Sequence, residues 1–179
     1  KKKKKTKNLK GIALNYFGNK ITYREFFENI DKVAKAFYAI GIRKGDIVTI
    51  ASMHTPETIY IIYGLNKIGA VANMVYLTLS ANEIIENIKS TDSKAFIYFT
   101  MIQEKGRIIE KKFPDIKTII LDVSDSMPWY LKYPYRLKNK KDILGKTYRF
   151  KNFLSLGEGV VAKEMLYTKN APAVIVYTS

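Results

Sequence analysis

Short apolar runs alternate along the chain with longer segments whose apolar residues have helical spacing. The clearest example lies between residues 45 and 80, where two apolar runs, 47–51 and 70–75, flank a segment with helical features. Thr55 suits the N-cap of that helix, and Pro56 suits its first position, because the N–H that proline lacks has no partner within the helix there. The pattern predicts a strand, a crossover helix and a second strand.

Apolar side chains cover most of the circumference of this central helix. They are Ile59, Tyr60, Ile61, Ile62, Tyr63, Leu65 and Ile68. A helix that is apolar on nearly every side must be packed on more than one side, so we expect it in the core.

The same alternation continues on both sides of the central unit. Thr22 and Glu25, like Ser80 and Glu83, have the spacing of a capping box and predict two more helix starts. Thr100 and Gln103 repeat the spacing and predict a third, in a helix that Pro114 ends.

Further apolar runs predict strands at 95–99, 116–121 and 173–176, the last with the composition of a buried strand. Strands that alternate with helices at this spacing indicate an α/β fold with a largely parallel sheet and flanking helices.

Residues 122–148 break this rhythm with prolines, tyrosines and lysines, and predict a partly helical insertion on the surface. The aromatic residues there are Trp129, Tyr130, Tyr133 and Tyr135. Because basic residues are interleaved with them, these aromatic rings could stack on the bases of single-stranded nucleic acid. The favoured interpretation is that they anchor a loop to the core while the lysines stay in water. Residues 150–156 predict a short helix.

Composition narrows the chemistry. The 179 residues, 47% hydrophobic, suit one well-buried domain. The absence of cysteine excludes disulfides, thiolate zinc sites and thiol nucleophiles. His54 is the only histidine, which excludes metal sites built from paired histidines, and we expect no metal site. No pair of nearby carboxylates stands out as an acid/base couple.

The net charge of +15 is concentrated in two segments. Residues 1–10 contribute +7 and predict a basic disordered tail; residues 132–151, with eight basic residues and one acid, contribute another +7. The rest of the chain is therefore close to neutral, and we expect no specific nucleic-acid partner. No apolar run approaches the roughly 20 residues that span a bilayer. The initial lysines lack the apolar run of a signal peptide, so we expect a cytoplasmic location.

Three local motifs do not carry nucleotide chemistry. Gly145-Lys146-Thr147 imitates the end of a P-loop, but Lys140 stands where the first glycine should be. Gly157 and Gly159 form half of a dinucleotide fingerprint and suit a turn better. His54 lies where a strand meets a helix; local hydrogen bonding is favoured over catalysis for it.

Eight short stretches follow one another in a recognisable order. They are 21–26 (ITYREF), 34–37 (AKAF), 41–48 (GIRKGDIV), 55–57 (TPE), 67–71 (KIGAV), 80–84 (SANEI), 91–94 (TDSK) and 173–179 (AVIVYTS). Together they resemble the opening of the AMP-forming acyl-CoA synthetases and related adenylating enzymes, over roughly residues 12–121 and 171–179. Residues 74–77 (MVYL) depart from the Pro-Leu-Asn-Pro type sequence frequent in that family, which leaves the acyl subclass open.

The resemblance implies that residues 11–179 are an incomplete N-terminal part of the family's large domain, with a basic surface insertion at about 122–150. It implies an ATP-dependent ligase that adenylates a carboxylic acid and transfers the acyl group to CoA, with Mg²⁺ at the phosphates. In the family, Thr178 and Ser179 would begin the phosphate-binding loop. The resemblance assigns no catalytic residue to this chain.

The isolated chain is therefore expected to be inactive in adenylation. Two alternatives remain open: a basic module that binds nucleic acid through the tail and residues 132–151, and a structural or regulatory fragment without a ligand. The substrate acid, the thiol acceptor and the oligomeric state are not fixed by the sequence.

Overall fold

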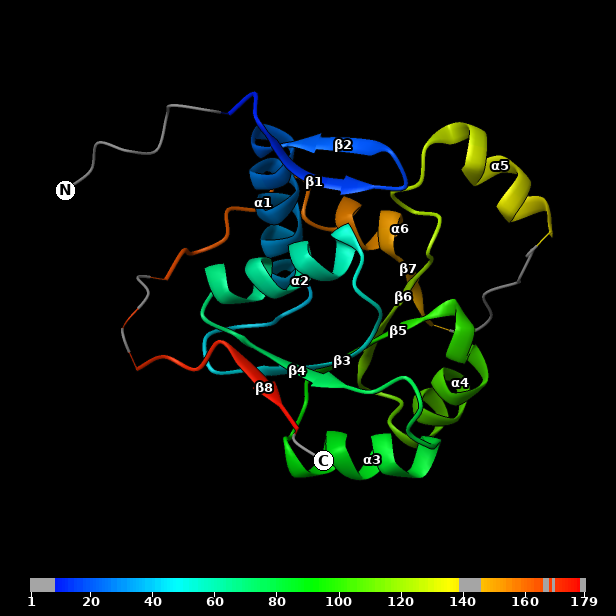
Figure 1. Ribbon diagram of the computed structural model, residues 1–179. Helices are drawn as coiled ribbons and strands as arrows, with labels where there is room; N and C mark the ends of the chain where they lie inside the picture. Colours follow the sequence, from blue (N-terminus) through cyan, green and yellow to red (C-terminus); the bar gives the residue numbers. More distant parts are fainter. Residues whose placement is uncertain (1–8, 139–145, 166–167, 169, 178–179) are drawn as a thin grey trace.

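The computed structural model describes residues 9–138, 146–165, 168 and 170–177. Its centre is a six-stranded sheet in which every neighbouring pair is parallel (Figure 1). In spatial order the strands are β7 (Tyr148–Arg149), β6 (Lys117–Leu121), β5 (Ala95–Phe99), β3 (Ile47–Ala51), β4 (Val71–Val75) and β8 (Val174–Val176). The predicted α/β class and parallel sheet are confirmed.

Helices cover both faces of this sheet (Figure 1). On one face lie α1 (Tyr23–Ala39), α2 (Pro56–Lys67) and α6 (Phe150–Ser155); on the other lie α3 (Ala81–Ser90) and α4 (Gln103–Lys112). Successive residues of a strand point to opposite faces, so each strand feeds two apolar layers. In β3, for example, Ile50 packs in the first layer and Ala51 in the second. Both layers of the core therefore depend on the same strands.

The helix starts follow the predicted capping chemistry, with one exception. Capping boxes form at Thr22 and Ser80, and Thr55 caps α2 with Pro56 at the first helical position. The helix expected to be capped at Thr100 instead begins at Gln103, after a 3₁₀ turn over Thr100–Ile102. The Thr100 hydroxyl donates to Asp122 Oδ2 at 3.2 Å, because the loop after β6 offers a carboxylate close to it.

Helix α2 is a core element, as its apolar circumference predicts. Ile61 and Leu65 are fully buried, and only Tyr63 among its large apolar residues is exposed. Gly64 allows α1 to come close: a Cβ atom on it would lie 2.7 Å from Val33 Cγ1 and 3.1 Å from the backbone nitrogen of Ala34. The contact between the two helices thus requires a residue without a side chain.

The expectation of a buried final strand is wrong in one respect. The strand β8 exists, but it lies at the edge of the sheet and pairs only with β4 among the described residues. Val176 is 67% exposed and Val174 is 38% exposed. The apolar composition of this strand is that of a central strand, and its place in the described sheet is that of an edge.

A hairpin of β1 (Ile12–Tyr16) and β2 (Asn19–Thr22) was not expected from the sequence. Phe17 and Gly18 form its turn with positive φ angles of 51° and 85°, the backbone of a two-residue hairpin turn. The hairpin contacts the loop after β6: the Tyr16 hydroxyl donates to the Val123 carbonyl at 3.0 Å. It therefore helps to hold a loop more than a hundred residues away in the chain.

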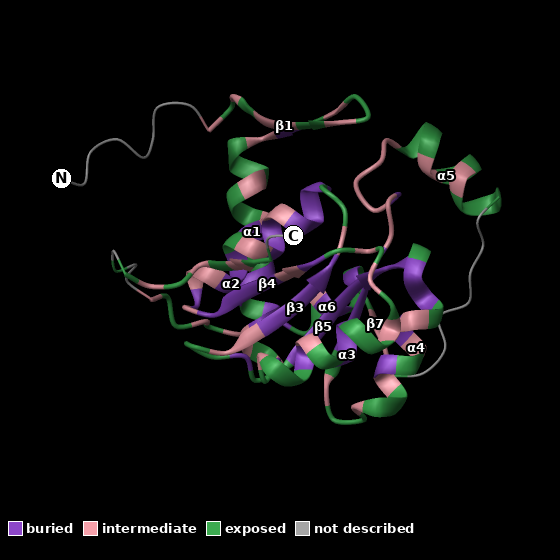
Figure 2. Ribbon diagram, turned by 60° about the horizontal axis from the view of Figure 1, so that its bottom comes forward, coloured by how far each residue is buried: buried purple, intermediate pink, exposed green. Residues whose placement is uncertain are grey.

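The segment after that loop is partly helical, as expected, and contains α5 (Trp129–Lys138). None of its residues is buried, and it projects from the body of the molecule (Figures 1 and 2). Trp129, Tyr133 and Tyr130 are 74%, 67% and 54% exposed. The interpretation that the aromatic residues anchor a loop to the core is wrong for these three, which are exposed; Tyr135 is half-buried.

Candidate functional site

The carboxyl ends of parallel strands meet at one edge of the sheet, and this edge is where ligands bind in open α/β folds. The part of this edge nearest to the predicted phosphate-binding residues is formed by the ends of β3, β4 and β8, with their following loops. The register places Met74 of β4 opposite Val176 of β8. Just beyond, the Tyr76 hydroxyl donates to the Tyr177 carbonyl at 3.4 Å. The chain is thus led out of β8 beside the end of β4.

The predicted phosphate-binding residues, Thr178 and Ser179, lie outside the described residues. The structure therefore describes the strand that precedes them and its neighbours, and their assignment stays a prediction. Tyr177, the last described residue, is 38% exposed.

The turn between β3 and α2 forms the next part of this edge. The Ser52 and Thr58 hydroxyls lie 2.6 Å apart, and the Thr58 hydroxyl donates to the Met53 carbonyl at 2.7 Å. These contacts fix the turn, and Thr55 caps the helix behind it. His54, at the same turn, is exposed.

A buried carboxylate lies at the first turn of α2. Glu57 is 3% exposed, and its Oε1 accepts a hydrogen bond from the Ser126 hydroxyl in the loop after β6. In the same loop, Asp125 Oδ2 accepts from the backbone N–H of Asp122 at 3.0 Å. Asp125 Oδ1 lies 3.1 Å from Arg136 Nη2 of α5. These contacts connect α2, the loop and α5.

Burial raises the pKa of both carboxyls. Burial raises the pKa of Glu57, and the charge of Asp125 adds to the rise while the hydrogen bond from Ser126 opposes it. Burial also raises the pKa of Asp125, against the effect of its backbone hydrogen bond and of Arg136. Burial, and then the charge of Glu57, raise the pKa of Tyr16 to about 12.

Sequence reasoning missed this cluster. Glu57 lies at the start of α2, and Asp125 lies in the loop after β6, nearly seventy residues later. No spacing rule in the sequence connects two segments so far apart. The one available signal is that Glu57 occupies the first turn of a helix, where a carboxylate is favoured by the helix dipole. The hydrogen bonds of Asp125 hold the loop and α5, which gives this carboxyl a structural task.

The cluster and the end of β8 belong to different parts of the same edge. In the order of the sheet, β5 and β3 separate β6, whose loop carries Asp125, from β4, which neighbours β8. The described parts of the chain contain no group of three or more histidine, cysteine or acidic residues that could hold a metal ion.

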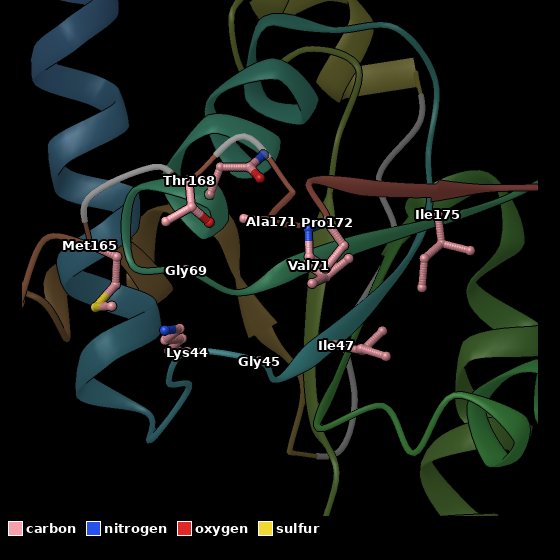
Figure 3. Close-up of a pocket in the computed structure, with 11 residues that line it drawn as sticks. Lys44, Gly45, Ile47, Gly69, Val71, Met165, Thr168, Ala171, Pro172 and Ile175 are labelled. Atoms are coloured by element: carbon pink, nitrogen blue, oxygen red, sulfur yellow. The ribbon is translucent and has the colours of Figure 1, made fainter.

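A cavity of about 330 Å³ lies at the opposite, amino-terminal edge of the sheet (Figure 3). Ile47 and Val71, the first residues of β3 and β4, line it together with Ile175 of β8. Lys44 also lines this cavity. Because the strands run away from this cavity, it is separate from the place where the chain continues into Thr178.

Comparison with known proteins identifies the family of this chain. The model of the AMP-binding enzyme family matches residues 2–179. The chain therefore belongs to the AMP-binding enzyme family, whose members in the comparisons that follow include acyl-CoA synthetases and adenylation domains.

Two curated relatives illustrate the match. Acetyl-coenzyme A synthetase 1 of Saccharomyces cerevisiae is 34% identical over 96 residues, which is 53% of this chain and 14% of the relative. The 3-hydroxypropionyl-coenzyme A synthetase of Metallosphaera sedula is 25% identical over 159 residues, which is 89% of this chain and 24% of the relative. The chain thus spans a quarter or less of the length of these enzymes.

Solved structures share the fold. The anthranilate CoA ligase AuaEII, in complex with anthranoyl-AMP, has a TM-score of 0.74 at 15% identity, over 96% of this chain and 30% of the ligase. The adenylation domain of a carboxylate reductase from Mycobacterium chelonae has a TM-score of 0.70 at 17% identity, over 89% of this chain and 26% of that domain. The sheet and its helices are those of the adenylate-forming enzymes.

Proposed function

We propose that this chain forms the N-terminal part of the large domain of an ATP-dependent acyl-CoA synthetase. In this proposal residues 11–179 belong to that domain, residues 1–10 are a basic tail, and residues 122–150 are a basic surface insertion. The observation that supports it best is the position of β8 beside β4, at the carboxyl edge where the family's phosphate loop would start.

The proposed reaction has two steps. A carboxylate attacks the α-phosphate of ATP and releases pyrophosphate, and the thiol of CoA then displaces AMP from the acyl-adenylate. Mg²⁺ bound to the phosphate oxygens would neutralise part of their charge. The hydroxyls and backbone N–H groups of Thr178 and Ser179 would donate to phosphate oxygens, where negative charge is present throughout the reaction.

The matched relatives suggest which acids to test first. Their names specify acetyl and 3-hydroxypropionyl groups, so acetate and 3-hydroxypropionate are reasonable first substrates. The departure at residues 74–77 covers the end of β4 and the two residues after it, at the proposed active edge, so the acid preference of this protein need not follow theirs.

Carboxylate-dependent exchange between ATP and pyrophosphate tests the proposal. We expect exchange from the full-length protein and none from residues 1–179 alone. In the full-length protein, Thr178→Ala should lower the exchange rate by about 100-fold, the usual cost of one lost donor to a reacting anion. Ser155→Ala, at an exposed hydroxyl on α6, is the matched control and should leave the rate unchanged.

Two results would contradict the proposal. Exchange by residues 1–179 alone would show that the chain does not depend on later residues. A full-length protein that exchanges pyrophosphate with no acid in a broad panel of carboxylates would remove the synthetase function.

A further inference from the structure

Helix α5 is attached to the body through its charged side. Arg136 Nε donates to the Ser124 hydroxyl at 3.0 Å, and Arg136 Nη2 lies 3.1 Å from Asp125 Oδ1. Lys132 Nζ donates to the Asp125 carbonyl at 3.0 Å. Lys132 and Arg136 are four residues apart, so they lie on one face of the helix. That face is directed at the loop after β6.

The neighbouring face of α5 is apolar and exposed. Trp129, Tyr133 and Leu137 follow one another at four-residue spacing and are 74%, 67% and 83% exposed. Tyr130, beside them, is 54% exposed. A surface helix normally turns its apolar face inward. In α5 the apolar face is exposed, while hydrogen bonds and an ion pair hold the neighbouring polar face against the loop.

We propose that the exposed face of α5, formed by Trp129, Tyr130, Tyr133 and Leu137, binds the surface of an anionic lipid membrane. The helix would lie in the plane of the membrane interface. This proposal concerns where the protein resides and does not depend on the adenylation chemistry.

The types of side chain favour a lipid interface. Trp and Tyr have a large apolar ring with a polar tip, and such rings collect at the level of the lipid headgroups. Leu137 has no polar tip and is the most exposed of the four, which suits insertion toward the acyl chains.

The charge around the helix favours anionic lipid. Lys138, directly after Leu137, is exposed, and so are Lys146, Arg149 and Lys151 later in the chain. Exposed basic residues next to an amphipathic helix are typical of segments that bind anionic headgroups.

Single-stranded RNA fits the same face less well. Stacking platforms for bases are flanked by cations that follow the phosphate backbone. In α5, Lys132 and Arg136 lie on the inward face and contact Ser124 and Asp125. Leu137, near the end of α5 on the outward face, has no ring on which a base can stack.

The chain contains its own reporter, because Trp129 is its only tryptophan. The experiment titrates the full 179-residue chain with phosphatidylserine/phosphatidylcholine vesicles and follows tryptophan fluorescence. We expect a blue shift, and quenching when the acyl chains are brominated. Pure phosphatidylcholine vesicles, or high salt with the mixed vesicles, should weaken binding, because salt screens the attraction between exposed charges.

The test variants keep the reporter and change its neighbours. Leu137→Ser and Tyr133→Ser should each weaken vesicle binding by at least about tenfold, since each removes a large apolar side chain from the lipid. Val161→Ser is the matched control, because Val161 is 87% exposed and lies outside α5, and its binding should be unchanged. Far-ultraviolet circular dichroism of each variant verifies that the fold is retained.

Three outcomes would overturn the proposal. The first is an unchanged Trp129 spectrum with anionic vesicles. The second is a response to single-stranded RNA without a response to vesicles, which would assign the face to nucleic acid. The third is a blue shift that depends on protein concentration without lipid, which would assign it to a second copy of the chain.

Discussion

Helices α2 and α5 are both rich in aromatic and branched apolar residues, yet they occupy opposite environments. Seven residues of α2 are buried, and none of α5 is. Tyr60 of α2 is 4% exposed and packs edge-on against Phe26 with ring centroids 5.8 Å apart, whereas Tyr133 of α5 is 67% exposed. Residue type alone does not distinguish them.

The two helices differ in their places in the topology. Helix α2 connects two neighbouring parallel strands, β3 and β4, so its short loops force it onto the sheet. Helix α5 lies in the long connection from β6 to β7, where no such constraint acts. Its orientation is set instead by Arg136 and Lys132, which bind the loop before it. Apolar residues are buried where the chain path requires it, and here a polar attachment overrides their preference.

The largest expected effect tests this difference directly. Ile61→Ala in α2 removes a fully buried side chain and should lower the free energy of unfolding by about 2–5 kcal/mol. Leu137→Ala in α5 is the matched control and should change it by no more than about 0.5 kcal/mol. Urea unfolding followed by circular dichroism measures both. Similar losses from the two variants would show that α5 is packed in solution.

The next effect concerns how closely α2 approaches α1. Gly64→Ala would place a Cβ 2.7 Å from Val33 Cγ1 and should lower the free energy of unfolding by about 1–3 kcal/mol, despite the better helix propensity of alanine. Combining it with Val33→Ala removes the nearest crowding atom, so the two losses should not add. An additive double mutant would contradict the observed contact.

A smaller effect is expected from the polar attachment of α5. Arg136→Ala removes the ion pair with Asp125 and the hydrogen bond to Ser124, and should lower the free energy of unfolding by about 1 kcal/mol. It should also change the mobility of Trp129, seen as lower fluorescence anisotropy. Lys138→Ala, on the same helix, is the control. Equal anisotropy in the two variants would mean that Arg136 does not hold the helix.

The smallest expected change is in the pH dependence of stability. Burial raises the pKa of Glu57 above its ordinary value of 4.5, so its folded form holds the proton more tightly than the unfolded chain. Its contribution to stability is therefore complete below that ordinary value and is lost as pH rises through the folded pKa. Glu57→Gln keeps an acceptor for Ser126 without the charge, and should lose less stability as pH rises.

Urea unfolding at a series of pH values measures this difference. Glu28→Gln, at an exposed position on α1, is the control and should follow the unchanged protein. If Glu57→Gln follows the unchanged protein as well, Glu57 is not a source of the pH dependence.

The sequence predicts much of the fold because most of its signals are local. Thr22, Thr55 and Ser80 cap their helices as expected, since caps are decided within four residues. The five predicted strands exist for a similar reason. The sequence does not predict the hairpin turn at Phe17 and Gly18. It also does not predict the exposed edge position of β8, because that position depends on which strands pair with it.

The candidate site is less predictable for a physical reason. The contact between Glu57 and Ser126 depends on how the loop after β6 folds back over α2, and no local rule describes that. The attachment of α5 through Arg136 depends on Asp125, a residue of that loop, in the same way. The order of short motifs identified the family, which matches residues 2–179, but it carries no information on these long-range contacts.

The pairing of β8 with β4 has a consequence for how the protein folds. It joins Ala72 to Val174, so a long loop must close before these strands can meet. Loop closure of this kind is slow and is not compensated until the distant contact forms. The strands β3 to β6 can assemble from nearer partners, so we expect β8 to dock last and to exchange its amide hydrogens first. The edge that would lead into the phosphate loop would then be completed only in the final step of folding.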